Sequence, residues 1–133
     1  MVKVLVKKLD PAVQLPSYIT NGASGMDLMA FIKEPIKLTT KKSCLVPTGI
    51  SVAMSDDYEI QIRPRSGLAA KNNISVLNAP GTIDSDYRGE IKIILFNHGD
   101  NDFIIKNKDR IAQMVLVPVN KINLRKLKIC QVL

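Results

Sequence analysis

The sequence predicts an all-β fold with one short helix. Three observations predict it. Apolar and polar residues alternate with a period of two along several segments. The seven prolines and seven glycines fall mostly between these alternating runs, which is typical of short strands joined by turns. No segment shows a long helical period. The length of 133 residues favours a single domain over residues 1–133.

The expected elements follow one another along the chain. Residues 2–8 and 58–64 alternate with a period of two and are expected to be half-buried strands. Residues 43–54 predict two short strands broken at 47–49, where proline and glycine interrupt the apolar run. Residues 66–72 predict the helix, with Ser66 in the N-cap position.

The second half of the chain predicts the centre of the sheet structure. Residues 79–89 are expected to form the loop of a β-hairpin, because apolar runs flank them on both sides. Residues 90–97 and 110–119 are apolar on both faces in part, which is typical of central strands in a sandwich or barrel.

The net charge of +7 leaves three interpretations: nucleic-acid binding, a solvated basic surface, or a site for a polyanionic small molecule. No tryptophan is present and aromatic residues make up only 5%, so nucleic acid is not expected as the main ligand. No apolar stretch approaches the about 18 residues of a membrane span. The N-terminus lacks a signal-peptide pattern, which favours a cytoplasmic protein. Cys44 and Cys130 lie in apolar runs and are expected to be reduced structural thiols.

Arg65, Ser66 and Gly67 form the first candidate site. They connect an expected strand to the start of the expected helix, where unpaired N–H groups and the helix dipole favour an anion. Arginine adds bidentate bonds to phosphate oxygens, and glycine lets the backbone approach closely. A phosphate cradle and a plain helix cap beside a surface arginine are equally supported by this segment alone.

Acidic residues form the second group of candidates. Asp84 and Asp86 stand just before Tyr87, and either carboxylate could act as a general base or simply stabilise a turn. Asp27 lies in a small apolar segment and would need partners if buried. Arg110 and Gln113 stand at the start of the last long strand.

Four segments stand in the order ASGMDLMA, RPRSGLAAK, NAPGTIDSDYRGEI and KDRIAQMV. Their order and spacing resemble four of the five motifs of the trimeric all-β dUTP pyrophosphatases (dUTPases), over about residues 1–133. The resemblance implies a distorted β-barrel or jelly-roll subunit and a homotrimer with active sites at subunit interfaces. It also implies Mg²⁺-assisted hydrolysis of dUTP to dUMP and pyrophosphate, which would keep uracil out of DNA and supply dUMP for dTMP synthesis.

The resemblance also implies roles for the candidate residues. Asp84 would orient the attacking water and touch the 3′-hydroxyl, while Tyr87 would pack on the deoxyribose and exclude a 2′-hydroxyl. Phosphate oxygens would be bound by Arg65, Ser66 and Gly67, and by Gln113 from another subunit. The nucleoside pocket would include Asn78, Thr82, Ile83 and Lys92, and Asp27 and Arg110 would support the site. Mg²⁺ would be held mainly by phosphates and water, with no direct protein ligand.

Two further expectations accompany the resemblance. The fifth motif, a glycine-rich C-terminal arm that closes over the substrate, is not present before residue 133, so we expect such a tail to follow. A dCTP deaminase of the same fold would need a glutamate at the base, and Glu90 is the one acid on this arm after Tyr87. A non-catalytic nucleotide- or nucleic-acid-binding relative is the other alternative.

Overall fold

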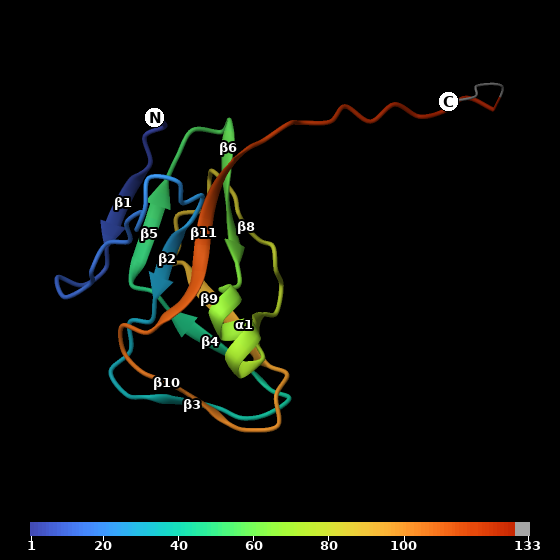
Figure 1. The fold of residues 1–133 in the computed structure, drawn as a ribbon. Helices are drawn as coiled ribbons and strands as arrows, with labels where there is room; N and C mark the ends of the chain where they lie inside the picture. The colour runs from blue at the N-terminus through green and yellow to red at the C-terminus, as the bar shows by residue number, and fades with distance from the viewer. Residues whose placement is uncertain (130–133) are drawn as a thin grey trace.

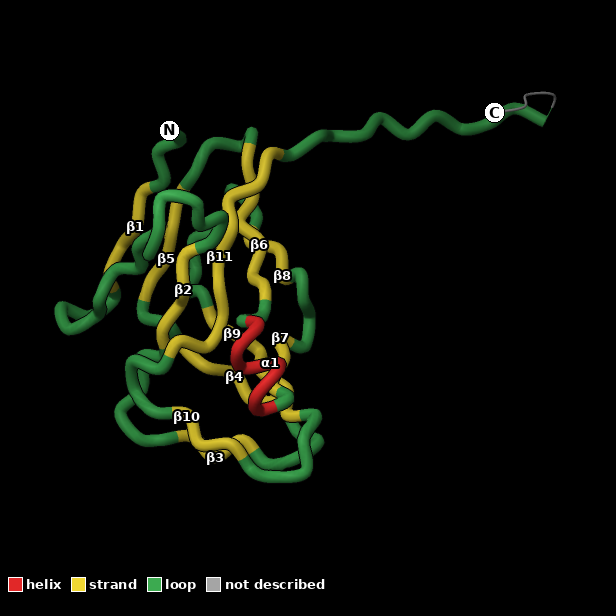
Figure 2. The backbone as a smooth tube through the Cα atoms, viewed as in Figure 1, coloured by secondary structure: helices red, strands yellow, loops and turns green. Residues whose placement is uncertain are grey.

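The computed structural model describes residues 1–129, which form small antiparallel sheets and one helix (Figures 1 and 2). The largest sheet has the strand order β2-β11-β6-β8, and a second sheet has the order β4-β9-β7. Two further pairs are β1–β5 and β10–β3. The elements are β1 Leu5–Lys8, β2 Met26–Met29, β3 Ile36–Leu38, β4 Ser43–Pro47, β5 Ile50–Ala53, β6 Tyr58–Arg63, α1 Ser66–Asn72, β7 Ile74–Val76, β8 Gly81–Ile83, β9 Lys92–Asn97, β10 Phe103–Ile105 and β11 Arg110–Pro118.

One apolar core lies between the sheets. Every strand of the described chain except β1 and β8 contributes at least one buried apolar residue to it. Buried and less buried side chains alternate along β9, where Ile93 and Leu95 are fully buried. The all-β fold with a single short helix, predicted from the alternation, is confirmed.

The strands near the N-terminus differ in part from the prediction. The break at 47–49 is confirmed, because β4 ends at Pro47 and β5 begins at Ile50. The predicted strand over 2–8 is shorter and covers only Leu5–Lys8. The prediction that this strand is half-buried is wrong, since all four of its residues are exposed. β1 pairs only with β5 and lies at a sheet edge, so neither of its faces is covered by the core.

The predicted hairpin around residues 79–89 is only partly correct. β7 and β9 do pair antiparallel, with Val76 opposite Leu95. The connection between them is not a free loop, because β8 within it pairs with β6 of the other sheet. The connecting segment (residues 77–91) therefore bridges the two main sheets.

The helix α1 begins where the sequence predicts, but its cap differs. The N-cap residue is Arg65, in extended conformation, and Ser66 is the first helical residue. No side chain caps the first turn, so the predicted N-cap role of Ser66 is wrong. The helix ends at Asn72, and the C-cap residue Asn73, with a left-handed φ of 57°, closes the last turn.

After β11 the chain continues as an extended segment that leaves the body of the molecule (Figure 1). The amide of Val119 donates to the carbonyl of Asp57 at 2.9 Å and is the last such bond before this segment among the described residues. Cys44 is a free thiol whose pKa is raised by burial in β4, and Cys130 lies outside the described residues. No helix within residues 1–129 is long and apolar enough to cross a membrane.

Candidate active site

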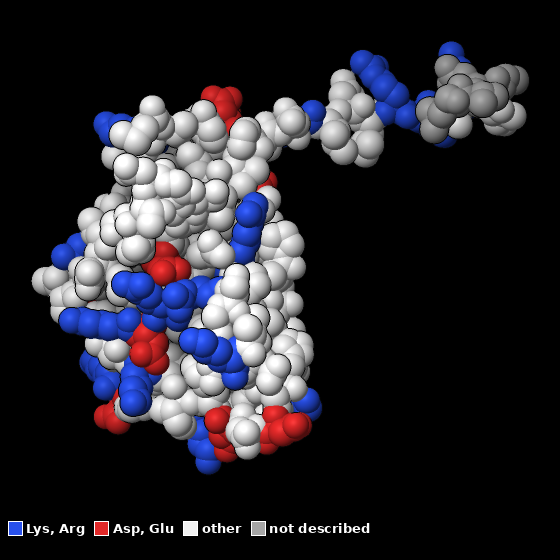
Figure 3. Space-filling view, viewed as in Figure 1, with Lys and Arg blue, Asp and Glu red and all other residues white. Residues whose placement is uncertain are grey.

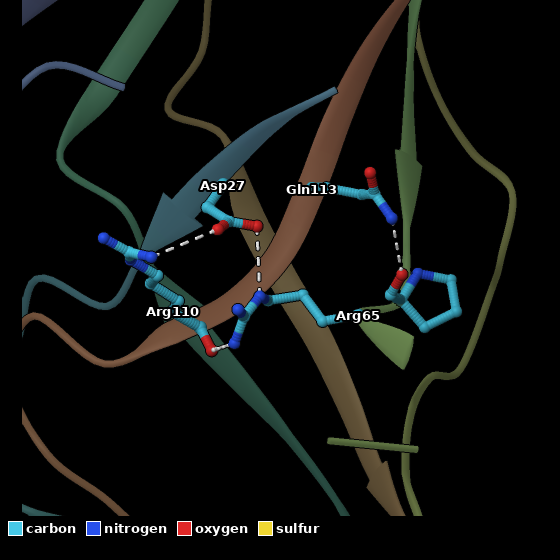
Figure 4. Close-up of polar contacts among 5 residues, drawn as sticks. Asp27, Arg65, Arg110 and Gln113 are labelled. Carbon is cyan, nitrogen blue, oxygen red and sulfur yellow. Dashed lines mark hydrogen bonds and ion pairs between the residues drawn. The ribbon is translucent and has the colours of Figure 1, made fainter. Parts of the chain in front are cut away.

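A charged cluster on β2, β11 and the start of α1 brings together three predicted residues (Figure 4). Arg65 donates from Nε to Oδ1 of Asp27 at 3.0 Å, and from Nη1 to the carbonyl of Arg110 at 3.3 Å. Arg110 approaches the other carboxylate oxygen of Asp27, with 3.7 Å between its Nη1 and Oδ2. The side chains of Asp27 and Arg65 are 24% and 31% exposed, so the pair faces the surface without being fully solvated.

Asp27, Arg65 and Arg110, together with Gln113, are called the anion cluster below, because their net positive charge suits an anionic ligand. Asp27 neutralises one arginine and orients both guanidinium groups, which holds them at fixed positions before any ligand arrives. A guanidinium has more N–H groups than the two that Arg65 uses here, so donors remain for a second anion. Figure 3 shows basic side chains gathered over β2 and the adjoining part of β11, with acidic side chains between them.

Gln113 joins the cluster through the sheet register. It lies opposite Asp27 on β2 and opposite Arg63 on β6, so the three side chains share one sheet face. Its Nε2 donates to the carbonyl of Pro64 at 3.0 Å. A Cβ on Gly25 would lie 2.5 Å from Oε1 of Gln113, so a side chain there would force the end of Gln113 to shift. The structure thus places Gln113 beside Arg65 of the same chain.

The first turn of α1 lies next to the cluster, and its residues Ser66 and Gly67 are exposed. Neither a side-chain cap nor an acidic residue occupies this turn. A Cβ added to Gly67 would meet nothing within 4 Å, so its backbone faces open space. A ligand can therefore reach the N–H groups of Ser66 and Gly67, beside the Arg65 guanidinium.

A second group of predicted residues lines a pocket on the connecting segment. The pocket has a volume of about 410 Å³, within the range of small-molecule sites. Five of the predicted residues line it, together with Leu45, Glu90 and Ile94; these five are Thr82, Ile83, Asp84, Tyr87 and Lys92. Asn78 does not line it and is exposed, with its side chain packed near Gly81.

Asp84 and Tyr87 lie together at the tip of the segment. The amide of Tyr87 donates to the carbonyl of Asp84 at 3.1 Å, which closes a turn. Within residues 1–129 the carboxylate of Asp84 makes no hydrogen bond or ion pair to protein, so it faces solvent ready to accept one. Asp86 does not line the tyrosine pocket; it lines a neighbouring hollow with Asp56, Glu59 and Lys121, which Asp84 also borders.

The two groups lie at opposite ends of β6. Ile83 pairs with Ile60, so Asp84 lies at the Tyr58 end of this strand, whereas Arg65 follows its other end. About six residues of nearly extended chain, from the level of Glu59 to Arg65, separate the two groups, or roughly 20 Å at about 3.3 Å per residue. One chain alone therefore does not bring Asp84 and Arg65 to the same phosphate.

No group of three or more histidine, cysteine or acidic side chains within residues 1–129 could hold a metal ion by itself. Asp27 is engaged by two arginines. Two acids line the pocket, and Glu90 accepts a hydrogen bond from Gly49, so Asp84 is the one with a free carboxylate among the described residues. Such a site suits an ion that is bound mainly by ligand phosphates and water, as Mg²⁺ commonly is.

Glu90 was not among the predicted site residues, although it lines the pocket with Tyr87. Its signal in the sequence is an acid placed at the end of a glycine-containing tip, just before a buried strand. Leu45 and Ile94 were also missed, because strand pairing between β4 and β9 brings them to the pocket from distant parts of the chain.

The fold and the two side-chain groups define a class: a small all-β protein with an anion cluster and a separate small-molecule pocket. A family model described as dUTPase matches residues 12–131, so the chain belongs to the dUTPase family. It is 59% identical over 112 residues to the deoxyuridine 5′-triphosphate nucleotidohydrolase of Chlamydia pneumoniae, covering 84% of this chain and 77% of that protein. The corresponding protein of Rickettsia bellii is 53% identical over 122 residues, covering 91% and 81%.

Solved structures of distant relatives share the fold. The dUTPase of Staphylococcus bacteriophage 80alpha aligns with a TM-score of 0.86 at 20% identity, covering 98% of this chain and 99% of that one. A point mutant of the dUTPase from phage phi11 of S. aureus, described with a structural Mg(II) ion, gives a TM-score of 0.85 at 19% identity over 95% of this chain and 97% of that chain. The dUTPase-like fold implied by the motifs is confirmed.

Proposed function

We propose that this protein hydrolyses dUTP to dUMP and pyrophosphate, and so keeps uracil out of DNA and supplies dUMP. The observation that carries the proposal is the shared pocket of Asp84 and Tyr87, in a chain of the dUTPase family. We further propose that residues 1–133 act as one domain in the cytoplasm.

Asp84 is the proposed catalytic base. Its carboxylate has no protein partner among residues 1–129, so it can accept a hydrogen bond from a water molecule and then its proton. That water attacks the α-phosphorus in line with the leaving pyrophosphate. Such a reaction needs positioning and charge neutralisation more than covalent catalysis, which is what one exposed carboxylate beside a rigid pocket supplies.

The pocket of the connecting segment is the proposed nucleoside site. Tyr87 packs on the deoxyribose and leaves no room for a 2′-hydroxyl, while backbone groups of the segment bind the uracil edge. Thr82, Ile83 and Lys92 line the pocket in support of this role. Asn78 lies outside it in this structure and would assist the base only after ligand-induced movement of the segment.

The anion cluster is the proposed phosphate site. Arg65, Ser66 and Gly67 bind the phosphate chain, with Gln113 as a further donor. Asp27 and Arg110 hold the Arg65 guanidinium in position through the bonds described above. Positioned donors cost less reorganisation when the charge develops at the phosphates.

Mg²⁺ is the proposed cofactor, and the donor set fits it. The chain offers no carboxylate cage within residues 1–129, so phosphate oxygens and water would hold the ion. When bound, it would neutralise phosphate charge. The residues of the chain would orient the phosphates around the ion, with the arginines on one side and Asp84 on the other.

A homotrimer with sites between subunits is the proposed assembly. The separation of roughly 20 Å between the levels of Asp84 and Arg65 supports it, because both residues must reach one phosphate chain. The nucleoside pocket of one chain would then work with the anion cluster of a neighbour. Since Gln113 lies beside Arg65, both would come from that same neighbouring chain.

A nucleotide panel tests the proposed function. Purified protein is incubated with dUTP, UTP, dCTP and dTTP, with and without Mg²⁺, and pyrophosphate and ammonia are measured. Pyrophosphate from dUTP alone, dependent on Mg²⁺, is the expected result. Ammonia from dCTP would instead identify a deaminase, and binding of dUTP without any product would identify a non-catalytic relative.

A further inference from the structure

Glu90 connects the tip of the connecting segment to the rest of the fold. Its Oε2 accepts a hydrogen bond from the backbone N–H of Gly49 at 2.9 Å, across the turn between β4 and β5. Glu90 is half-buried, so this charge-assisted bond is partly shielded from water. The catalytic roles proposed above make no use of this carboxylate.

The donor of this bond is held at a fixed position. Gly49 has a φ of +73°, which favours glycine, and a Cβ there would lie 2.6 Å from Cγ2 of Val13. The turn is also bonded to the backbone next to Glu90. Thr48 donates to the carbonyl of Ile91 from both its amide and its hydroxyl, and Ile91 donates to Ile50 at 2.9 Å. The turn therefore forms a rigid anchor for Glu90.

The other end of the connection is the ring of Tyr87. Its hydroxyl donates to the carbonyl of Glu90 at 2.8 Å. Gly89 lies against the ring, because a Cβ there would be 2.5 Å from the tyrosine oxygen. Among residues 1–129, Arg88 bonds only within the tip, to the carbonyls of Ser85 and Tyr87. Glu90 is thus the residue through which the tyrosine is joined to the β4–β5 turn.

We propose that Glu90 is a positioning residue for sugar selectivity, which holds the ring of Tyr87 where it blocks a 2′-hydroxyl. The proposal rests on the proposed function. The side chain fixes residue 90 against Gly49, and the backbone carbonyl of the same residue fixes the tyrosine hydroxyl. Without the side-chain bond, the bonds described above hold residue 90 only through its neighbour Ile91, so the carbonyl and the ring gain part of their freedom and a ribose can enter the pocket.

A purely structural role predicts something different. If Glu90 only stabilises the fold, its loss lowers the melting temperature and lowers the activity on dUTP and UTP together. A positioning role changes the ratio of the two, because only the ribonucleotide gains from a displaced ring. The ratio of kcat/KM for dUTP to that for UTP is therefore the informative measurement.

The test compares Glu90→Ala with Glu90→Gln, whose amide oxygen can still accept from Gly49. Glu34→Ala, at an exposed site, is the matched control. Glu90→Ala should lower the dUTP-to-UTP ratio by about tenfold, the scale of one lost hydrogen bond to a charged group. Glu90→Gln and Glu34→Ala should keep ratios near wild type. An unchanged ratio in folded Glu90→Ala overturns the proposal, as does an equal loss in Glu90→Gln, since that would implicate the charge.

A second variant covers the case in which Glu90→Ala does not fold. Gly89→Ala displaces the ring directly and leaves the Glu90 carboxylate intact, so it should lower the same ratio. A wild-type ratio in that variant overturns the proposal. If wild type releases no pyrophosphate from dUTP, the proposed function fails. The Glu90 proposal is then judged by the affinities for dUTP and UTP, which should show the same change in ratio.

Discussion

At the scale of single residues, the free carboxylate of Asp84 gives the sharpest prediction. Asp84→Asn should keep dUTP binding and lower kcat by about 10²–10⁴-fold, the usual contribution of a general base. The fold should be unaffected, because this carboxylate contacts no protein group within residues 1–129. Pyrophosphate release and the Kd of a non-hydrolysable dUTP analogue are the measurements.

Asp86→Asn is the matched control for that experiment. It removes the same charge two residues away, on the side of the segment that faces Asp56 and Glu59. Its kcat should stay within a few fold of wild type. Near-wild-type turnover in Asp84→Asn, or an equal loss in both variants, would contradict the assignment of the base.

Tyr87 gives a second prediction at this scale. Tyr87→Ala should raise kcat/KM for UTP relative to dUTP by about tenfold or more, because the steric block against a 2′-hydroxyl is removed. The ring is 43% exposed, so the fold should tolerate the change. Tyr87→Phe keeps the ring but loses the bond to Glu90, and its ratio should lie between those of wild type and the alanine variant. Continued exclusion of UTP by Tyr87→Ala would place the sugar selection elsewhere.

At the scale of elements, the start of α1 gives a prediction about the binding of the substrate phosphates. Gly67→Ala should weaken the binding of dUTP, since a methyl group would occupy the open space beside the first-turn N–H groups. The free energy of unfolding should stay the same or rise by up to ~1 kcal/mol, because alanine favours helix over glycine. Titration of the nucleotide and thermal unfolding measure the two effects. Unchanged dUTP affinity would show that the substrate does not approach this turn.

Elements with strict alternation were predictable from the sequence, and those shaped by distant partners were not. The strand at 58–64 and the helix at 66–72 match because their patterns are local. The exposure of β1 and the pairing of β8 with β6 depend on which strands lie beside them, and period alone does not encode that. The uncapped first turn of α1 was missed because Arg65, bonded to Asp27, takes the N-cap position.

At the scale of the whole molecule, the sequence predicted candidate site residues but not their grouping. Motif spacing selected Arg65, Asp84, Tyr87 and Gln113 as candidates. It did not reveal that Gln113 lies beside Arg65 while Asp84 lies far from both, because that grouping follows from sheet register. The hydrogen bond between Glu90 and Gly49 joins residues 41 positions apart and has no local pattern.

The division of the site between chains gives the last prediction. Arg65→Ala and Asp84→Asn should each be nearly inactive, and light scattering should show a trimer for both. If each site takes Asp84 from one chain and Arg65 from a neighbour, subunits exchanged between the two variants should form some intact sites. A random equal mixture should restore about a quarter of wild-type activity, since each site draws its two chains independently. Each variant refolded alone is the control. No recovery in confirmed mixed trimers, or a monomer by light scattering, would show that one chain builds the whole site.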